Sequence, residues 1–217
     1  TDEVFPGFRG PMCAYGCGML QGKVVDDLRL RDHGFEIIKP GAKGSDLHPF
    51  PDGTYLGGPE ISGPLDQAHQ IRELSKNDAQ GFFHWESFWD EATGILYPFF
   101  LTEPPTLADL IESVRGTARE QVLEKMLTWS LVDLADSFFE DERVKAFVLG
   151  IGEADIRAPG SLMTTAYFRC GRFSREQDSG LPRGGMGAIT RAMAESAVTF
   201  GAELRTGTAV ERVIVED

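Results

Sequence analysis

The spacing of apolar residues predicts that the middle of the chain is helical. From Leu107 to Gly150 the pattern is almost continuously that of amphipathic helices. Ser130, three residues before Asp133, indicates a new helix start inside this stretch. The turn-forming run Pro159-Gly160-Ser161 is expected to end the helical region. The apolar positions that repeat on one face are Val122, Met126, Leu127, Leu131, Leu134 and Phe138.

Two further helices are predicted upstream. Pro64 suits the first turn of a helix that runs to about Leu74. Ser75, with Asp78 three residues later, resembles a capping box that opens a second helix. This second helix carries an aromatic stripe whose spacing could line a pocket for a large apolar ligand, but is more typical of protein core. The stripe consists of Phe82, Trp85, Phe88 and Trp89.

The first part of the chain is predicted to be rich in strands and turns. A short helix ends at His33 and Gly34, because glycine suits the left-handed position after a helix and histidine suits its negative end. Phe35 to Ile38 is a plausible strand. Leu47 to Leu56 is predicted to be a hairpin, with its turn at Pro51-Asp52-Gly53.

The last part of the chain is predicted to be an α/β unit. The run Arg183-Gly184-Gly185-Met186-Gly187 precedes a helix, Gly201 ends it, and a strand follows from Ala202 to Arg205. A second strand, Ala209 to Val215, stops where a hairpin turn is expected. The first residue is Thr1 rather than Met, so both ends are expected to be cuts. The predicted fold class is therefore α/β in the form of an α+β fragment, with a long helical insertion.

Composition excludes several classes of protein. With 217 residues, of which 41% are hydrophobic, the chain can bury one sizeable core or a core with a satellite subdomain. A net charge of -13 would repel a phosphate backbone, so nucleic acid is not an expected partner. No stretch approaches the roughly 20 apolar residues that span a bilayer, and the first residues do not resemble a signal peptide.

The residues that usually carry catalysis do not form a recognisable set. Cys13, Cys17 and Cys170 are expected to be packing residues of a protein in a reducing compartment. The acidic run 140–142 is expected to be a solvated helix junction rather than a metal site, because no histidine flanks it. His84, within the aromatic stripe, is the only histidine worth testing for catalysis. Glycines between Gly10 and Gly22 indicate either close approach to a ligand or tight packing.

The stretch from Gly184 to Asp217, GGMGAITRAMAESAVTFGAELRTGTAVERVIVED, resembles a segment of the phytoene desaturase and carotenoid isomerase group of flavoproteins. In that group the segment leads back into the FAD-binding domain. The resemblance continues upstream, through PGFR at 6–9, DLRLRDHG at 27–34, PFPDG at 49–53, SKNDAQ at 75–80, FFEDERVKA at 138–146 and APGS at 158–161.

The resemblance implies a partial FAD-binding Rossmann-like domain of the glutathione reductase type 2 class, with a largely helical substrate-domain insertion. Residues 1–45 would belong to the FAD-binding domain and a connector, 46–180 to the substrate domain, and 181–217 to the return into the FAD-binding domain. The G-x-G-x-x-G turn that holds the pyrophosphate of FAD does not occur in this sequence.

Four positions are implied to contact FAD by the same resemblance. The backbone of Val210 is expected to grip the adenine. Cys13, Ala14 and Tyr15 are expected to run beside the isoalloxazine ring, although relatives often carry Gly and His where this chain has Cys13 and Tyr15.

The implied function is that of an FAD-dependent oxidoreductase that removes a hydride from a hydrophobic small molecule. The isolated chain is expected to bind FAD poorly, to be inactive, and to associate, with a homo-oligomer as one form of that association. The alternatives are a flavin-dependent enzyme similar to amine oxidases and a non-catalytic helical binding module. The expected location is the bacterial cytoplasm, with the mitochondrial matrix as the alternative.

Overall fold

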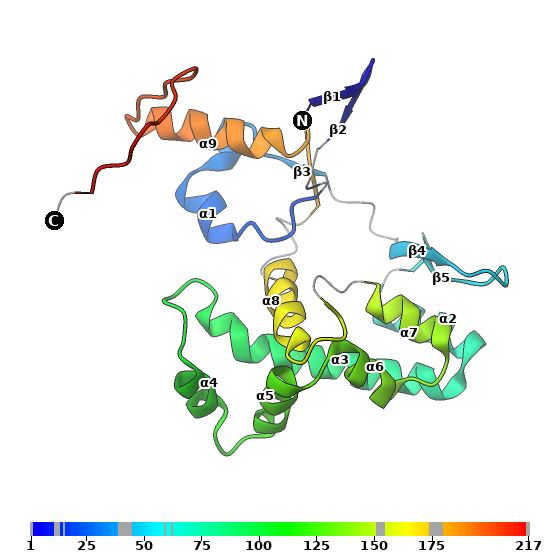
Figure 1. Cartoon of the computed structure of the whole chain (residues 1–217). Helices are drawn as coiled ribbons and strands as arrows, with labels where there is room; N and C mark the ends of the chain where they lie inside the picture. Colours follow the sequence, from blue (N-terminus) through cyan, green and yellow to red (C-terminus); the bar gives the residue numbers. More distant parts are fainter. Residues whose placement is uncertain are drawn as a thin grey trace. The chain divides into compact units, whose positions relative to one another are not determined.

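The chain has a mixed α and β fold that is mostly helical, with small two-stranded sheets (Figure 1). The computed structural model describes residues 2–10, 14, 16–38, 45–58, 60–61, 63–150, 155–173 and 180–215. The chain divides into two compact units. One unit combines residues 1–38 with 177–217, and the other, which we call the helical unit, spans 39–176.

The helical unit is built around one long helix, α3, which runs from Lys76 to Leu96. The helices of this unit, in chain order, are α2 (Pro64–Leu74), α3, α4 (Leu107–Val114), α5 (Arg119–Thr128), α6 (Leu131–Phe138), α7 (Glu142–Leu149) and α8 (Ser161–Phe173), with a 3-10 turn, η2, at Tyr97–Phe99. Helix α3 packs against α2, α4, α5, α6 and α8.

The aromatic stripe of α3 forms the centre of the core, as its spacing indicated. Trp85 and Trp89 are 1% exposed, and their rings meet edge to face with centroids 5.5 Å apart. Phe88 lies edge-on to Trp89, at 5.3 Å. The interpretation of the stripe as core, rather than as the wall of a ligand pocket, is confirmed.

Hydroxyl and carboxylate side chains set the helix starts. Ser130 and Asp133 form a capping box at the helix start that the sequence predicted: the Asp133 N–H donates to Ser130 Oγ, and the Ser130 N–H donates to Asp133 Oδ2. At the start of α3 the Asp78 N–H donates to Ser75 Oγ, so Ser75 is confirmed as the helix cap, but the reciprocal bond of a capping box is not formed. Asp141 caps α7, which makes the acidic run 140–142 a helix junction.

The expectation that Pro159-Gly160-Ser161 ends the helical region is wrong. Ser161 instead begins α8, and Leu162, Ala166 and Cys170 are almost fully buried at a spacing of four residues along one helix face. Ser161 Oγ accepts a hydrogen bond of 2.8 Å from the Leu131 N–H, which ties the start of α8 to the start of α6. The Pro-Gly pair lies in the connection that precedes α8. Gly160 there has a φ of +79°, a left-handed conformation that glycine adopts readily.

A hairpin completes the helical unit. Strands β4 (Ser45–Pro49) and β5 (Tyr55–Gly58) pair antiparallel, with His48 opposite Leu56. The turn at Pro51-Asp52-Gly53 is confirmed, since Gly53 has a φ of +86° and Asp52 accepts hydrogen bonds from Thr54.

The unit formed by residues 1–38 and 177–217 has a small core of its own. Val25, Leu30 and Phe35 pack with Ile189 and Ala192. Its elements are β1 (Asp2–Phe5), β2 (Phe8–Gly10), α1 (Gly22–Asp27), the 3-10 helix η1 (Leu30–His33), β3 (Ile37–Ile38), β6 (Leu181–Pro182) and α9 (Gly187–Thr199). Strand β1 pairs with β2, and β3 with β6, both antiparallel.

Two predicted strands are not formed. Residues 202–205 and 209–215 contain no strand, although α9 and the left-handed Gly201 before them are where the sequence placed them. A strand needs a hydrogen-bonded neighbour, and Val210, Val213 and Val215 are each at least 79% exposed. The predicted strand Phe35–Ile38 is likewise reduced to Ile37–Ile38, because the Phe35 N–H donates to the Leu30 oxygen of η1 and not to a neighbouring strand. The described residues contain no parallel sheet, so the Rossmann-like assignment stays a prediction.

Candidate functional site

Two of the four residues expected to contact FAD lie in the described part of the chain. Ala14 is exposed, whereas Cys13 and Tyr15 lie outside the described residues. The side chain of Val210 is 79% exposed, and its backbone N–H and C=O have no hydrogen bond to any described residue. Its backbone is therefore open to an external partner.

Close backbone packing near the start of the chain requires a glycine at position 180. Cys17 and Gly180 exchange two backbone hydrogen bonds of 2.8 Å. A side chain at Gly180 would begin 2.8 Å from both Ile37 Cγ2 and Ile38 O, so only glycine fits there. A side chain at Gly16 would begin 3.6 Å from the oxygen of Gly180, an ordinary contact. Close packing therefore explains Gly180, and the two interpretations of the glycines between Gly10 and Gly22 stay predictions.

The basic residue before α9 is held by an ion pair within its own unit. Arg183 binds Glu36 with two hydrogen bonds, of 2.6 Å from Nε and 2.9 Å from Nη2. The hydrogen bond from Arg183 lowers the pKa of the Glu36 carboxyl. The Arg183 N–H also donates to the backbone oxygen of Glu36, alongside the pairing of β3 with β6. Arg183 therefore fixes the chain leading into α9.

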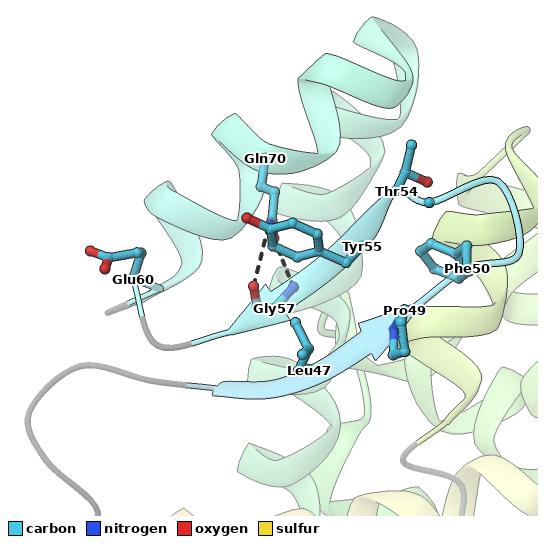
Figure 2. A pocket seen from close by; sticks show the side chains of 9 residues that line it. Leu47, Pro49, Phe50, Thr54, Tyr55, Gly57, Glu60 and Gln70 are labelled. Atoms are coloured by element: carbon cyan, nitrogen blue, oxygen red, sulfur yellow. Dashed lines mark hydrogen bonds between the residues drawn. The ribbon is translucent and has the colours of Figure 1, made fainter.

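An open hollow of about 480 Å³ lies beside the β4–β5 hairpin of the helical unit (Figure 2). Its wall is mainly apolar, with Leu47 and Tyr55 each more than half exposed. Glu60 and Gln70 contribute polar groups. The lining residues are Leu47, Pro49, Phe50, Gly53, Thr54, Tyr55, Gly57, Glu60 and Gln70. A wall of this kind can remove water from an apolar molecule.

Gln70 on α2 holds strand β5, which lines the hollow. Its Oε1 accepts the Gly57 N–H at 2.7 Å, and its Nε2 donates to the Gly57 oxygen at 3.2 Å, as Figure 2 shows. The side-chain amide thus bonds the backbone at the edge of β5 that does not pair with β4, as a neighbouring strand would. Gln67, itself buried, donates to the same Oε1 at 3.1 Å and orients the amide.

The tip of the hairpin is fastened to α7 by charge. Arg143 Nη1 lies 2.8 Å from Asp52 Oδ2, and Arg143 Nη2 lies 2.6 Å from Asp141 Oδ2. Hydrogen bonds from Thr54 and then from Arg143 lower the pKa of the Asp52 carboxyl. His48 packs edge-on against Phe147, at 4.9 Å. The hollow is therefore framed by a hairpin that is held both along its edge and at its turn.

A partly buried charged pair lies between α3 and α8. Arg169 is 9% exposed, with Nη1 3.7 Å from Glu86 Oε1 and its guanidinium 4.7 Å from the centre of the Trp89 ring. Burial raises the pKa of the Glu86 carboxyl, and nearby Asp90 adds to the rise, while Arg169 opposes it. Sequence reasoning missed Glu86, because a glutamate on a helix has no distinctive spacing.

The raised pKa of Glu86 predicts how Glu86→Gln alters stability with pH. A carboxyl with a raised pKa binds its proton more tightly in the folded state, so its contribution to stability falls as the pH rises from about 4.5 through the folded pKa. Relative to the unmodified protein, Glu86→Gln should therefore gain stability across that window and not below it. Urea unfolding at several pH values measures this, with the exposed Glu124→Gln on α5 as the background. If the stability difference between Glu86→Gln and the unmodified protein did not change with pH, the effect of burial on Glu86 would be contradicted.

The other side chains that the sequence singled out have structural positions. His84 is exposed and stacks on Phe138, with ring centres 6.4 Å apart. His33 lies at the end of η1, with Nδ1 4.0 Å from Glu195 Oε2. Cys170 is buried, which raises the pKa of its thiol to about 11. Among the described residues no group of three or more His, Cys, Asp or Glu side chains is arranged to hold a metal ion.

The chain is similar along nearly its whole length to two mammalian proteins. It is 26% identical over 247 residues to pyridine nucleotide-disulfide oxidoreductase domain-containing protein 2 of Rattus norvegicus, and 26% identical over 248 residues to the protein of that name of Mus musculus. Each alignment covers 99% of this chain and 42% of the relative, so the chain spans less than half the length of these proteins. The sequence matches no protein-family model.

Two further findings concern the source of the relatives and the hydropathy of the helices. The relatives are mammalian and give no support to the expected bacterial source. None of the helices in the described ranges is long and apolar enough to cross a bilayer.

Proposed function

We propose that this chain is part of an FAD-dependent oxidoreductase of the phytoene desaturase-like kind that oxidises a hydrophobic small molecule. The proposal depends chiefly on the alignment of 99% of the chain with a protein named for its oxidoreductase domain. In this proposal the unit of residues 1–38 and 177–217 belongs to the FAD-binding domain, and the helical unit is the substrate domain.

The described residues fit one part of a flavin site. Val210 presents an unpaired and exposed backbone, which is what a contact to the edge of an adenine ring requires. Ala14 is exposed, and its side chain is a single methyl group. The chain contains no G-x-G-x-x-G turn, so these residues would hold the cofactor together with a phosphate-binding segment that is not in this sequence.

The helical unit would supply substrate binding. FAD, when bound, accepts a hydride from the substrate. Leu47, Phe50 and Tyr55 offer apolar surface on which a hydrophobic molecule can lie out of water. Gln70 keeps that wall in place by holding both backbone groups of Gly57. No proton transfer by a side chain is needed for this role.

Replacing Val210 with proline should lower FAD binding by about tenfold, because proline removes the backbone N–H while leaving an apolar side chain. Val210→Ala is the matched control, since it shortens the side chain and keeps the backbone groups. The measurement is the FAD released on denaturation of the complete polypeptide encoded by the gene. Equal FAD loss in both variants would contradict a backbone contact.

The same preparation tests the cofactor itself. Stoichiometric FAD released from the complete polypeptide supports the oxidoreductase. A flavin-free protein would instead favour a non-catalytic helical binding module. The 217-residue chain alone should retain little FAD, and tight stoichiometric binding by it would refute the need for a separate phosphate-binding segment.

A further inference from the structure

Three basic residues line a second hollow of the helical unit. This hollow has a volume of about 320 Å³ and lies where α2 passes into α3 through the single residue Ser75. It is lined by His69, Arg72 and Lys76, together with Ala68, Ala79, Gln80 and Phe83. None of these residues borders the apolar hollow beside the hairpin, so the two hollows are separate.

The two full positive charges at this hollow have no ion pair with the described residues. Arg72 and Lys76 have no carboxylate within 4.0 Å in the described part of the chain. Cations that do pair with described carboxylates include Lys23, Arg29, Arg115, Arg119, Arg143, Lys145 and Arg183.

The lining residues suit a small organic molecule that carries a group with two negative charges. Arg72 offers a planar fork of donors, and Lys76 adds a second full positive charge beside it. His69 and the amide of Gln80 can donate further hydrogen bonds. Phe83, 45% exposed, presents an apolar surface at the same hollow.

We propose that this hollow binds a small organic phosphate, with the phosphate at Arg72 and Lys76 and the organic part against Phe83. Two fixed positive charges balance a phosphate dianion, whereas a carboxylate would neutralise only one of them. The buried methyl groups of Ala68 and Ala79 form part of the lining, so the organic part would meet an apolar surface.

The proposal is tested by titrating the purified protein with phenyl phosphate, inorganic phosphate and phenylacetate, using calorimetry. We expect phenyl phosphate to bind most tightly, and its affinity to fall as salt is added, because exposed charges are screened. Phenylacetate binding as tightly as phenyl phosphate would overturn the assignment to phosphate. Failure of both phosphates to bind would overturn the site.

Variants locate the binding. The double variant R72Q/K76Q should bind phenyl phosphate at least about tenfold more weakly. The matched control R157Q/R212Q removes the same charge from two arginines elsewhere, and it should leave the affinity unchanged. Equal loss in both double variants would show attraction to overall charge, and so refute a site. Phe83→Ala should weaken phenyl phosphate but not inorganic phosphate. Because Arg72 and Lys76 have no ion pair with described residues, unchanged urea unfolding is expected.

Discussion

Gly81→Ala is expected to destabilise the helical unit by about 3 kcal/mol or more, because the added methyl group has no room. A Cβ built at Gly81 would lie 2.1 Å from the backbone oxygen of Phe138 and 3.5 Å from the ring of Phe139. Backbone cannot move aside as a flexible side chain can. The end of α6 would have to separate from α3, and the gain of up to about 1 kcal/mol in helix propensity does not offset that.

Gly94→Ala on the same helix is the matched control. There the Cβ would lie 2.8 Å from Nη2 of Arg119, the far end of a flexible side chain that can swing away. Arg119 would give up a long hydrogen bond of 3.4 Å to the Gly94 oxygen and disturb its exposed ion pair with Glu91, so the stability should stay within about 1 kcal/mol of the unmodified protein. Urea unfolding followed by circular dichroism measures both variants. Equal stability of the two would mean that α3 and α6 do not meet as closely as described.

Features that depend on a few neighbouring residues could be predicted from the sequence. The Ser130 and Asp133 capping box, and the left-handed Gly34, need only residues three or four apart. The same is true of the hairpin turn after Phe50. The aromatic stripe was also assigned correctly to the core, since its periodicity reports which helix face is buried.

Features that depend on distant partners could not be predicted. The terminal segment 209–215 has the apolar alternation of a strand, but pairing requires a neighbour that the described residues do not supply. The start of α8 was missed because Pro159-Gly160 was interpreted as a stop, while its role depends on Ser161 bonding Leu131 thirty residues earlier. A strong local turn signal marks a break in the chain and does not determine which element comes next.

The hollow beside the β4–β5 hairpin also depends on distant partners. Gln70 was not singled out from the sequence, because a glutamine on a short helix has no distinctive spacing. Its importance comes from Gly57, thirteen residues earlier, whose two backbone groups it holds. Val210 was found only through resemblance, and the structure adds that its backbone is exposed and has no hydrogen bond to a described residue.

Asp78 is the residue whose role changes most between sequence and structure. The sequence predicted that it would complete a capping box with Ser75, and its N–H does donate to Ser75 Oγ. Its carboxylate, however, is fully buried and accepts the N–H groups of Glu140 at 2.9 Å and Asp141 at 2.8 Å. One residue at the start of α3 therefore holds the connection between α6 and α7.

Asp78→Ala should accordingly cost about 3 kcal/mol of stability, because two N–H groups would lose a charged acceptor in a buried place. Asp109→Ala is the matched control: Asp109 occupies the same third position, in α4, but is exposed and bonds only Thr106, so about 1 kcal/mol is expected. Asp78→Asn should fall between the unmodified protein and Asp78→Ala, since the amide keeps one acceptor oxygen and turns its NH₂ toward the second N–H. Urea unfolding ranks the three variants. If Asp78→Ala cost no more than Asp109→Ala, Asp78 would be an ordinary helix cap, and the α6–α7 connection would be held by Arg143 and the packing of Phe139 instead.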